Sequence, residues 1–344
     1  MPPAVTSDQI DRFRAAVTEL AGGVEPGRRL GIAVSGGPDS LALLVIAAAA
    51  LPGAIAAATV DHGLRAEAAQ EAAMVAGVCA SLGVPHRILA GPMGDRGPVQ
   101  AEARRLRYRL LGAWAEEEEL GAVATAHHLD DQAETFLMRA VRGAGAGGLA
   151  GIRARITLVA VPVPVIRPLL GWRRAELASV IAAAGLKPAD DPSNRDPAYD
   201  RTAFRALLGR EPLLRPQGVA AAAAHLADAE EALGWIAGRL AAERLVMAGG
   251  KVRLVDPAGL PREMRRRLAE RAIGLLSGGR PLRGDALDRL LRLLDGGRAA
   301  TLAGVLARPG ADWWFAPVPP RADRPRNRDG SPGASIAINP DRLI

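Results

Sequence analysis

The sequence predicts an α/β protein: a doubly wound parallel sheet in the first half of the chain, followed by a smaller, mostly helical second domain. Three observations support this prediction. Short apolar strands alternate with helices up to about residue 141, a turn rich in glycine and serine directly follows the first strand, and the regular alternation ends after Ala146. Strands that alternate with helices form parallel sheets whose faces the helices cover. Ligands of such sheets bind beyond the carboxyl ends of the strands.

The sheet domain contains four predicted strand–helix pairs, separated by glycine, proline or polar residues. The strands are expected at 28–34, 53–60, 84–91 and 122–126, and the helices at 40–50, 67–82, 99–118 and 130–141. A further strand, punctuated by prolines, is expected at 161–170, and a helix at 172–184. We assign residues 1–215 to this domain.

The second domain, residues 216–320, begins with an alanine-rich helix that we expect to extend from Pro216 to about Met247. Two short helices are expected next, at about 261–277 and 284–295, and then a hairpin at 300–318 that turns at Pro-Gly-Ala-Asp. The segment 321–344 is rich in Pro, Gly, Asp, Asn and Arg, which predicts a disordered tail.

The composition excludes several classes of protein. The longest apolar stretch is broken by Pro52 and Gly53, so it predicts a helix and a strand rather than a membrane span. The N-terminal segment contains acidic residues and no apolar core, so it is not a signal peptide, and we expect a cytoplasmic protein. The single cysteine, Cys79, lies in an apolar helical run; it predicts a buried thiol, with no disulfide and no metal cluster.

The net charge of +7 is unevenly distributed. Residues 139–215 contain 13 basic and 6 acidic residues, and residues 262–298 contain 10 basic and 5 acidic residues. A solvated surface is the simpler interpretation of scattered charge. Two basic blocks nevertheless favour a large polyanion over a small molecule as partner.

The most specific motif lies between the first strand and the next helix, and it consists of Ser35, Gly36, Gly37, Pro38, Asp39 and Ser40. Glycines let backbone amides close on phosphate oxygens, and a helix N-terminus favours negative charge. Asp39 would repel phosphate unless it acts through Mg²⁺, so the loop predicts a magnesium-bound nucleotide. No Gly-Lys pair ends the loop, so it is not a Walker A motif. It resembles the SGGxDS signature of the PP-loop ATP pyrophosphatases, which transfer AMP to a substrate oxygen.

Asp61 and His62 follow the second strand, at the edge of the sheet where the phosphate loop is expected. A polar group there suits contact with the nucleoside. A simple strand-end cap is the alternative interpretation of Asp61.

An acidic cluster is expected on the helix after the fourth strand. Asp131 shares a helix face with His127 and Glu134, and Asp130 precedes it. Such a cluster suits Mg²⁺ binding or proton transfer at an attacking amine. Capping of the helix by Asp130 and Asp131 is the structural alternative.

Six segments together resemble the tRNA(Ile)-lysidine synthetase family in their order and spacing: SGGPDS, VDHGLR, AEARRLRY, AHHLDDQAETFLMRAVRG, IRPLLGWRR and DDPSNRDPAYDRTAFR. The resemblance is good over about residues 28–205 and weaker over 216–316, which is similar to the family's tRNA-contacting middle domain. Many members have a further C-terminal domain, which we expect to be absent here.

The resemblance implies an enzyme that uses ATP and Mg²⁺ to adenylate the wobble cytidine of an isoleucine tRNA with a CAU anticodon. Free L-lysine then displaces AMP to give lysidine, and codon reading changes from AUG to AUA. A monomer or homodimer is expected.

The resemblance also implies roles for individual residues. ATP is bound by residues 35–40 with Asp61 and His62, and Asp39 binds Mg²⁺. Catalysis is assigned to Asp39, Asp131 and Arg201. Substrate or tRNA binding is assigned to Arg104, Arg107, Asp130, Glu134, Asn194 and Arg205. Whether the arginines meet transferring phosphates or the RNA backbone stays open, and a solvated helix face is the alternative for Arg104 and Arg107.

An unpaired base needs a stacking partner, for which Tyr108, Tyr199, Phe204 or an arginine plane are candidates. For Trp313-Trp314-Phe315, core packing is favoured over RNA stacking.

Three other functions compete with this interpretation. A tRNA 2-thiolation enzyme needs catalytic cysteines, which one apolar-flanked cysteine does not supply. Amidating synthetases such as NAD or asparagine synthetase lack the acidic and Asn–Arg patterns. A non-catalytic tRNA-binding relic would not need Asp39 or the acidic cluster.

Overall fold

The computed structural model describes residues 4–22, 27–61, 67–92, 99–158, 160–189, 200–279, 282 and 284–318. Contacts divide the chain into two compact units, Met1–Glu231 and Ala232–Ile344. The division falls inside the long helix α9 (Pro216–Arg244), and not at residue 215, where the sequence places the domain boundary. The physical reason is that both halves of α9 are packed: Ala223 is buried in the first half, and Ala237 belongs to the core of the second unit. The predicted tail lies outside the described residues.

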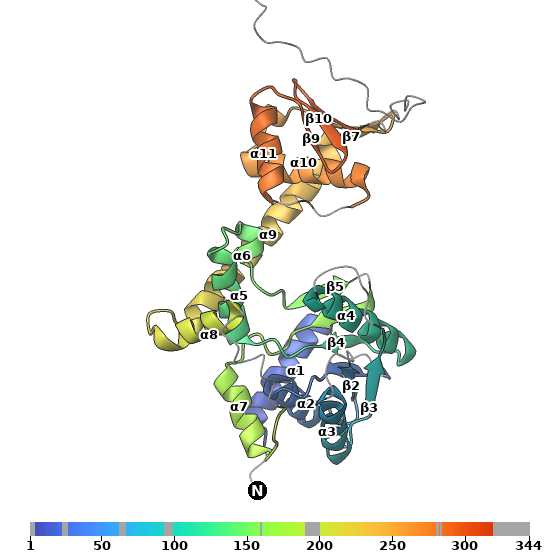
Figure 1. Cartoon of the computed structure of the whole chain (residues 1–344), viewed down its shortest axis with the longest axis vertical. Helices are drawn as coiled ribbons and strands as arrows, with labels where there is room; N and C mark the ends of the chain where they lie inside the picture. The colour runs from blue at the N-terminus through green and yellow to red at the C-terminus, as the bar shows by residue number, and fades with distance from the viewer. Residues whose placement is uncertain are drawn as a thin grey trace, which may run out of the picture. The chain divides into compact units, whose positions relative to one another are not determined.

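The first unit contains a six-stranded sheet in the order β3-β2-β1-β4-β6-β5. Figure 1 labels four of these strands, β2, β3, β4 and β5. Its strands are β1 (Leu30–Ala33), β2 (Ile55–Asp61), β3 (His86–Ala90), β4 (Ala122–Ala124), β5 (Arg155–Leu158) and β6 (Val161–Ile166). All pairings except β5–β6 are parallel, which confirms the predicted parallel sheet. The antiparallel edge strand β5 was not predicted, because its exposed and half-buried side chains form no apolar run.

Helices cover both faces of this sheet. The helices described in this unit are α1 (Ser7–Ala21), α2 (Pro38–Ala50), α3 (Glu67–Ser81), α4 (Val99–Glu117), α5 (Leu129–Ala140), α6 (Ala146–Leu149), α7 (Arg174–Ala183) and α8 (Asp200–Arg210). Because strand side chains alternate between faces, Ile55 and Ala57 join a core with α1, α2, α3 and α7, whereas Ala56 and Ala58 join a second core with α4. None of the helices in the described ranges is long and apolar enough to cross a membrane.

The second unit pairs α10 (Arg262–Ser277) and α11 (Gly284–Asp295) with an antiparallel sheet in the order β7-β8-β11-β10-β9. Its strands are β7 (Leu245–Ala248), β8 (Lys251–Leu254), β9 (Ala300–Leu302), β10 (Val305–Arg308) and β11 (Trp313–Pro317), and a short 3₁₀ turn, η2, spans Pro257–Gly259. The two predicted helices and the β10–β11 hairpin are confirmed. The unit contains more sheet than the predicted mostly helical domain, since β7 and β8 also pair with the hairpin. Trp313 and Phe315 are buried as predicted, while Trp314 points outward.

Candidate active site

The turn between β1 and α2 has the geometry of an anion-binding loop. Gly36 adopts a left-handed φ of 83°, and Gly37 begins α2 without a side-chain cap on the helix amides. The Ser40 hydroxyl donates to the Gly37 carbonyl at 2.9 Å and accepts from the Ser35 N–H at 3.1 Å, which closes the loop. Pro38 occupies the first helical turn, where its missing N–H loses no hydrogen bond. Glycine backbone and uncapped helix amides together suit phosphate oxygens.

Asp39, in the first turn of α2, lies close to the buried His128 at the N-terminus of α5. His128 Nε2 lies 3.4 Å from Asp39 Oδ2 and 3.6 Å from Asp131 Oδ2. Burial alone would raise the pKa of Asp39, but His128 and the charges of Arg174 and Arg205 outweigh burial and lower it. The carboxylate therefore stays ionised at neutral pH. With 32% of its side chain exposed, it is accessible to a ligand.

The start of α5 determines how His128 is oriented. His128 is the N-cap: its Nδ1 accepts the Asp131 N–H at 3.4 Å, and its own N–H donates to Asp131 Oδ2 at 3.1 Å. An accepting Nδ1 leaves the ring proton on Nε2, the atom nearest Asp39. Nε2 is buried and makes no aligned hydrogen bond to any residue the structure describes. Sequence reasoning missed His128, because histidine is not a favoured N-cap and its spacing suggested no metal site.

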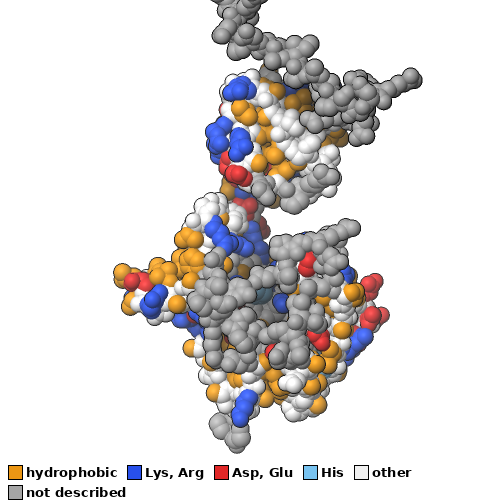
Figure 2. Space-filling model, in the orientation of Figure 1, with side chains coloured by type: hydrophobic (Ala, Val, Ile, Leu, Met, Phe, Trp, Pro, Cys, Tyr) orange, Lys and Arg blue, Asp and Glu red, His pale blue; other side chains and the backbone are white. Residues whose placement is uncertain are grey.

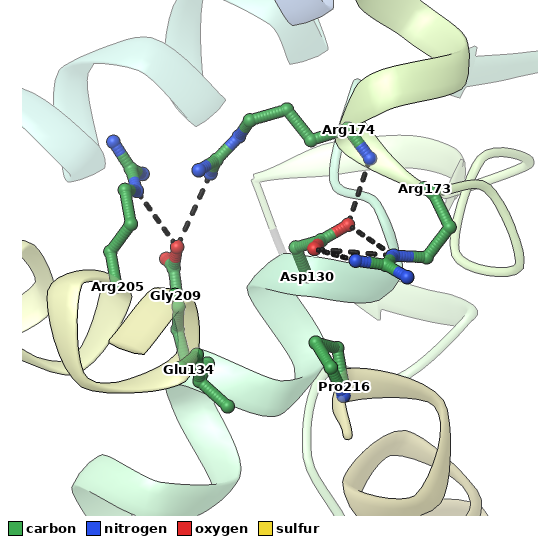
Figure 3. Close-up of a pocket in the computed structure, with 8 residues that line it drawn as sticks. Asp130, Glu134, Arg173, Arg174, Arg205, Gly209 and Pro216 are labelled. Carbon is green, nitrogen blue, oxygen red and sulfur yellow. Dashed lines mark hydrogen bonds and ion pairs between the residues drawn. The ribbon is translucent and has the colours of Figure 1, made fainter. Parts of the chain in front are cut away.

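Glu134 is the centre of an arginine cluster that Figure 3 shows in part. Its side chain is 1% exposed, and its Oε1 accepts from Arg205 Nε at 2.9 Å and from Arg174 Nη2 at 3.2 Å. Its Oε2 lies 3.4 Å from Arg201 Nε. Arg174 begins α7, and the other two arginines project from α8. Since Arg174 and Arg205 also lower the pKa of Asp39, the cluster lies within electrostatic reach of the phosphate loop.

Asp130 holds the beginning of α7. Its carboxylate accepts from Arg173 Nε at 3.1 Å, from Arg173 Nη2 at 3.0 Å and from the Arg174 N–H at 2.8 Å (Figure 3). Burial opposes ionisation, but these donors lower the pKa of Asp130. Asp130 and Glu134 line a cavity of about 210 Å³ with Arg173, Arg174 and Arg205. The cavity thus presents both carboxylates and guanidinium groups to a ligand.

Arg104 and Arg107 lie on an exposed face of α4. Arg104 stacks on the Tyr108 ring, with its Cζ 4.9 Å from the ring centroid. Burial, together with the charges of three arginines including Arg104, lowers the pKa of His127 to about 4, although Asp131 acts in the opposite sense. His127 is therefore neutral at physiological pH, and the charge of Arg104 acts on this residue, which lies two positions before the first residue of α5.

Of the remaining predicted residues, the structure describes Asp61 but not His62 or Asn194. Asp61 ends β2 at the carboxyl edge of the sheet and is half-buried. His62 and Asn194 lie outside the described residues, as does the stacking candidate Tyr199. Sequence reasoning gave no role to Arg173 or Arg174, because their acidic partners lie 40 or more residues earlier in the chain.

Comparison with known proteins identifies the family to which the chain belongs. A model described as a PP-loop domain matches residues 7–211. A tRNA(Ile)-lysidine synthase of Zymomonas mobilis is 48% identical over 297 residues, which cover 85% of this chain and 89% of that protein. The chain belongs to the tRNA(Ile)-lysidine synthase family. A second synthase of this name, from Novosphingobium aromaticivorans, is 47% identical and covers 92% of this chain and 97% of its own length.

A solved structure supports the fold of this chain. It is the U34-tRNA thiolase of Methanococcus maripaludis with its 4Fe-4S cluster, which superimposes with a TM-score of 0.53 at 17% identity. The match covers 65% of this chain and 80% of the thiolase. At this identity the likeness shows a shared PP-loop fold.

Proposed function

We propose that this synthase joins free lysine to the wobble cytidine of an isoleucine tRNA with a CAU anticodon and forms lysidine, AMP and pyrophosphate. One observation carries the proposal: in a chain of this family, the phosphate loop, the acidic helix α5 and the arginines of α7 and α8 converge on Asp39. A tRNA and free lysine as substrates place the reaction in the cytoplasm.

In the first step the phosphate loop binds the β,γ-pyrophosphate of ATP. The 2-carbonyl oxygen of cytidine attacks the α-phosphorus, an O–P bond forms, the α–β anhydride bond breaks, and pyrophosphate leaves. Arg174 and Arg205, already within reach of Asp39, stabilise the charge of the leaving group.

The residues at this loop fit a nucleotide-bound magnesium ion. Mg²⁺ takes one or two carboxylates together with substrate phosphate oxygens, and it withdraws charge from those phosphates. Asp39 offers an ionised, partly exposed carboxylate beside the loop. The described residues contain no group of three His, Cys, Asp or Glu side chains that could hold a metal ion without the nucleotide.

In the second step an amine of lysine attacks C2 of the adenylated base, the C–O bond breaks, and AMP leaves. The lysine ammonium must first lose a proton. Asp130 is paired with Arg173, and Glu134 with three arginines, whereas Asp131 has no arginine partner within the described part of the chain. Asp131 is therefore the best-placed carboxylate to accept that proton. The charged cavity beside Asp130 and Glu134 suits the carboxylate and second ammonium of lysine.

Thiolation of the tRNA is a less favoured function. Sulfur transfer requires reactive cysteines. Cys79 is the single cysteine of the chain; it is buried in the apolar core, and burial raises its pKa to about 11. A thiol in this environment is a weak nucleophile.

Nucleoside mass analysis tests the proposal. The isoleucine tRNA is incubated with enzyme, ATP, magnesium and lysine, and then digested to nucleosides. The expected product is cytidine plus lysine minus water, with pyrophosphate released in equal amount. A sulfur-for-oxygen mass change would favour thiolation, and absence of pyrophosphate release would favour a non-catalytic tRNA-binding protein.

A further inference from the structure

The excess positive charge of the chain is located in its second unit, on which Figure 2 shows a group of Lys and Arg side chains at the surface. Residues 232–344 contain 20 basic and 11 acidic residues, whereas residues 1–231 contain 24 basic and 26 acidic residues. The unit without the phosphate loop is thus the one whose charge suits a polyanion.

Half of the twelve arginines described in this unit are already paired with carboxylates of the same unit. Arg262 pairs with Asp288 at 2.7 Å, and Arg253 lies 3.5 Å from Asp312. The pairs Arg244–Asp256, Arg265–Asp295 and Arg266–Glu263 behave in the same way. Arginines satisfied internally contribute little to recognition of an external anion. The informative arginines are those that lack such a partner.

An exposed tryptophan on α9 lies in a stretch of helix that two arginines approach, and neither arginine has a carboxylate partner in the described part of the chain. The helix buries Ala237 and packs Leu233 and Leu240 against the core, while Trp235 is 64% exposed on another face. Arg239, one turn later, lies with its Cζ 5.2 Å from the centre of the Trp235 ring. Arg271 of α10 approaches the same stretch of α9: its Nη1 lies 3.9 Å from where a Cβ on Gly238 would stand. Neither arginine has a carboxylate partner among the described residues.

A single exposed apolar residue needs no functional explanation. Here, however, an exposed tryptophan lies against one guanidinium group that has no carboxylate partner among the described residues, and a second such group approaches α9 at Gly238, three residues along the helix. A ring face stacks on nucleobases, and guanidinium groups bind phosphates or stack on the next base. A protein partner of opposite charge would meet the arginines equally well but would not require an open ring face next to them.

We propose that Trp235, Arg239 and Arg271 form an RNA-contact surface that stacks an unpaired nucleotide of the substrate tRNA and binds its phosphate. The inference rests on the proposed function, because that function supplies the RNA substrate. It assigns a role in RNA recognition to three residues of the unit that does not contain the phosphate loop.

The test is direct binding of an isoleucine tRNA transcript to the full chain at fixed salt concentration, measured by fluorescence anisotropy. Loss of a stacking contact in Trp235→Ala should weaken binding about 10-fold, and Trp235→Phe should retain most of the affinity. Trp314→Ala is the matched control: Trp314 is also exposed and stacked on an arginine, but its partner Arg253 is already neutralised by Asp312. The control should bind within about 2-fold of the wild type.

A second variant tests the charges. Replacing both Arg239 and Arg271 by Gln should lower the slope of log affinity against log salt by about 1 to 2, as expected for one or two lost phosphate contacts. Unchanged melting temperatures would show that all variants fold. Wild-type affinity of Trp235→Ala, or equal losses in the Trp235 and Trp314 variants, would overturn the surface.

The same binding assay separates this inference from the proposed reaction. If the wild-type enzyme forms no lysidine but Trp235→Ala still loses tRNA affinity, the result supports the contact surface and refutes the proposed reaction. If lysidine forms and Trp235→Ala binds tRNA with wild-type affinity, the result supports the proposed reaction and refutes the contact surface. Binding of a protein partner but not of RNA by the wild-type chain also refutes the surface.

Discussion

Replacement of Glu134 by Gln removes the negative charge that forms ion pairs with three arginines, while the size of the side chain stays the same. In the wild type a carboxylate that is 1% exposed faces Arg205 at 2.9 Å, Arg174 at 3.2 Å and Arg201 at 3.4 Å. The amide of Gln can accept from one of them only weakly. The remaining arginines then repel one another around a neutral group.

The size of the effect follows from burial. Breaking a fully buried ion pair costs about 3–5 kcal/mol. The arginine side chains are 31%, 45% and 35% exposed, so they can turn toward solvent and recover part of this energy. We expect a loss of about 1–3 kcal/mol in the free energy of unfolding. For a unit of this size this corresponds to a melting temperature lower by about 2–10 °C.

Activity should fall as well, because Arg174 and Arg205 are no longer held near Asp39. Adenylation, measured as tRNA-dependent pyrophosphate release, is expected to slow by about 10- to 100-fold. Glu231→Gln is the control, since Glu231 is exposed and should leave both stability and rate unchanged. An unchanged melting temperature in Glu134→Gln would refute the idea that this carboxylate organises the arginines. A raised KM for lysine with normal adenylation would instead show that Glu134 meets the amino acid.

Three further predictions concern α2 and α5. Asp39→Ala should abolish adenylation while tRNA binding survives, and equal loss of both would contradict its role at the nucleotide. Because the pKa of His127 in the folded state, about 4, lies below its ordinary value of 6.5, the unfolded chain takes up the proton first as the pH falls. The wild type should therefore lose about 2 kcal/mol of unfolding free energy between pH 7 and pH 5 through this group; His127→Gln should flatten that part of a urea-unfolding profile, and identical profiles would refute the assignment. His128→Ala should lose about 1 kcal/mol of capping energy together with ATP affinity. His128→Asn should recover the stability but not the ATP affinity, because Asn caps a helix yet does not reach Asp39; full recovery of both would leave His128 as a cap alone.

Local patterns were sufficient to predict much of the fold. The glycines and serines of residues 35–40 identify a phosphate loop because their chemistry is expressed within one turn. The apolar runs at 28–34 and 53–60 predict buried parallel strands because both faces of such strands are covered. The edge strand β5 and the strands β7 and β8 escaped prediction, since short, half-exposed strands obtain their stability from the neighbour with which they pair.

The features of the site also divide into those that the sequence determines and those that only the tertiary structure decides. By itself the sequence determined the loop, the acidic helix and the family, because each depends on residues close together in the chain. Only the tertiary structure decided that His128, and not His127, faces Asp39, because the N-cap of α5 orients one ring toward α2. It also decided that Glu134 meets arginines from α7 and α8, 40 to 71 residues later. Ion pairs depend on distance in space, and packing of helices brings such remote charges together.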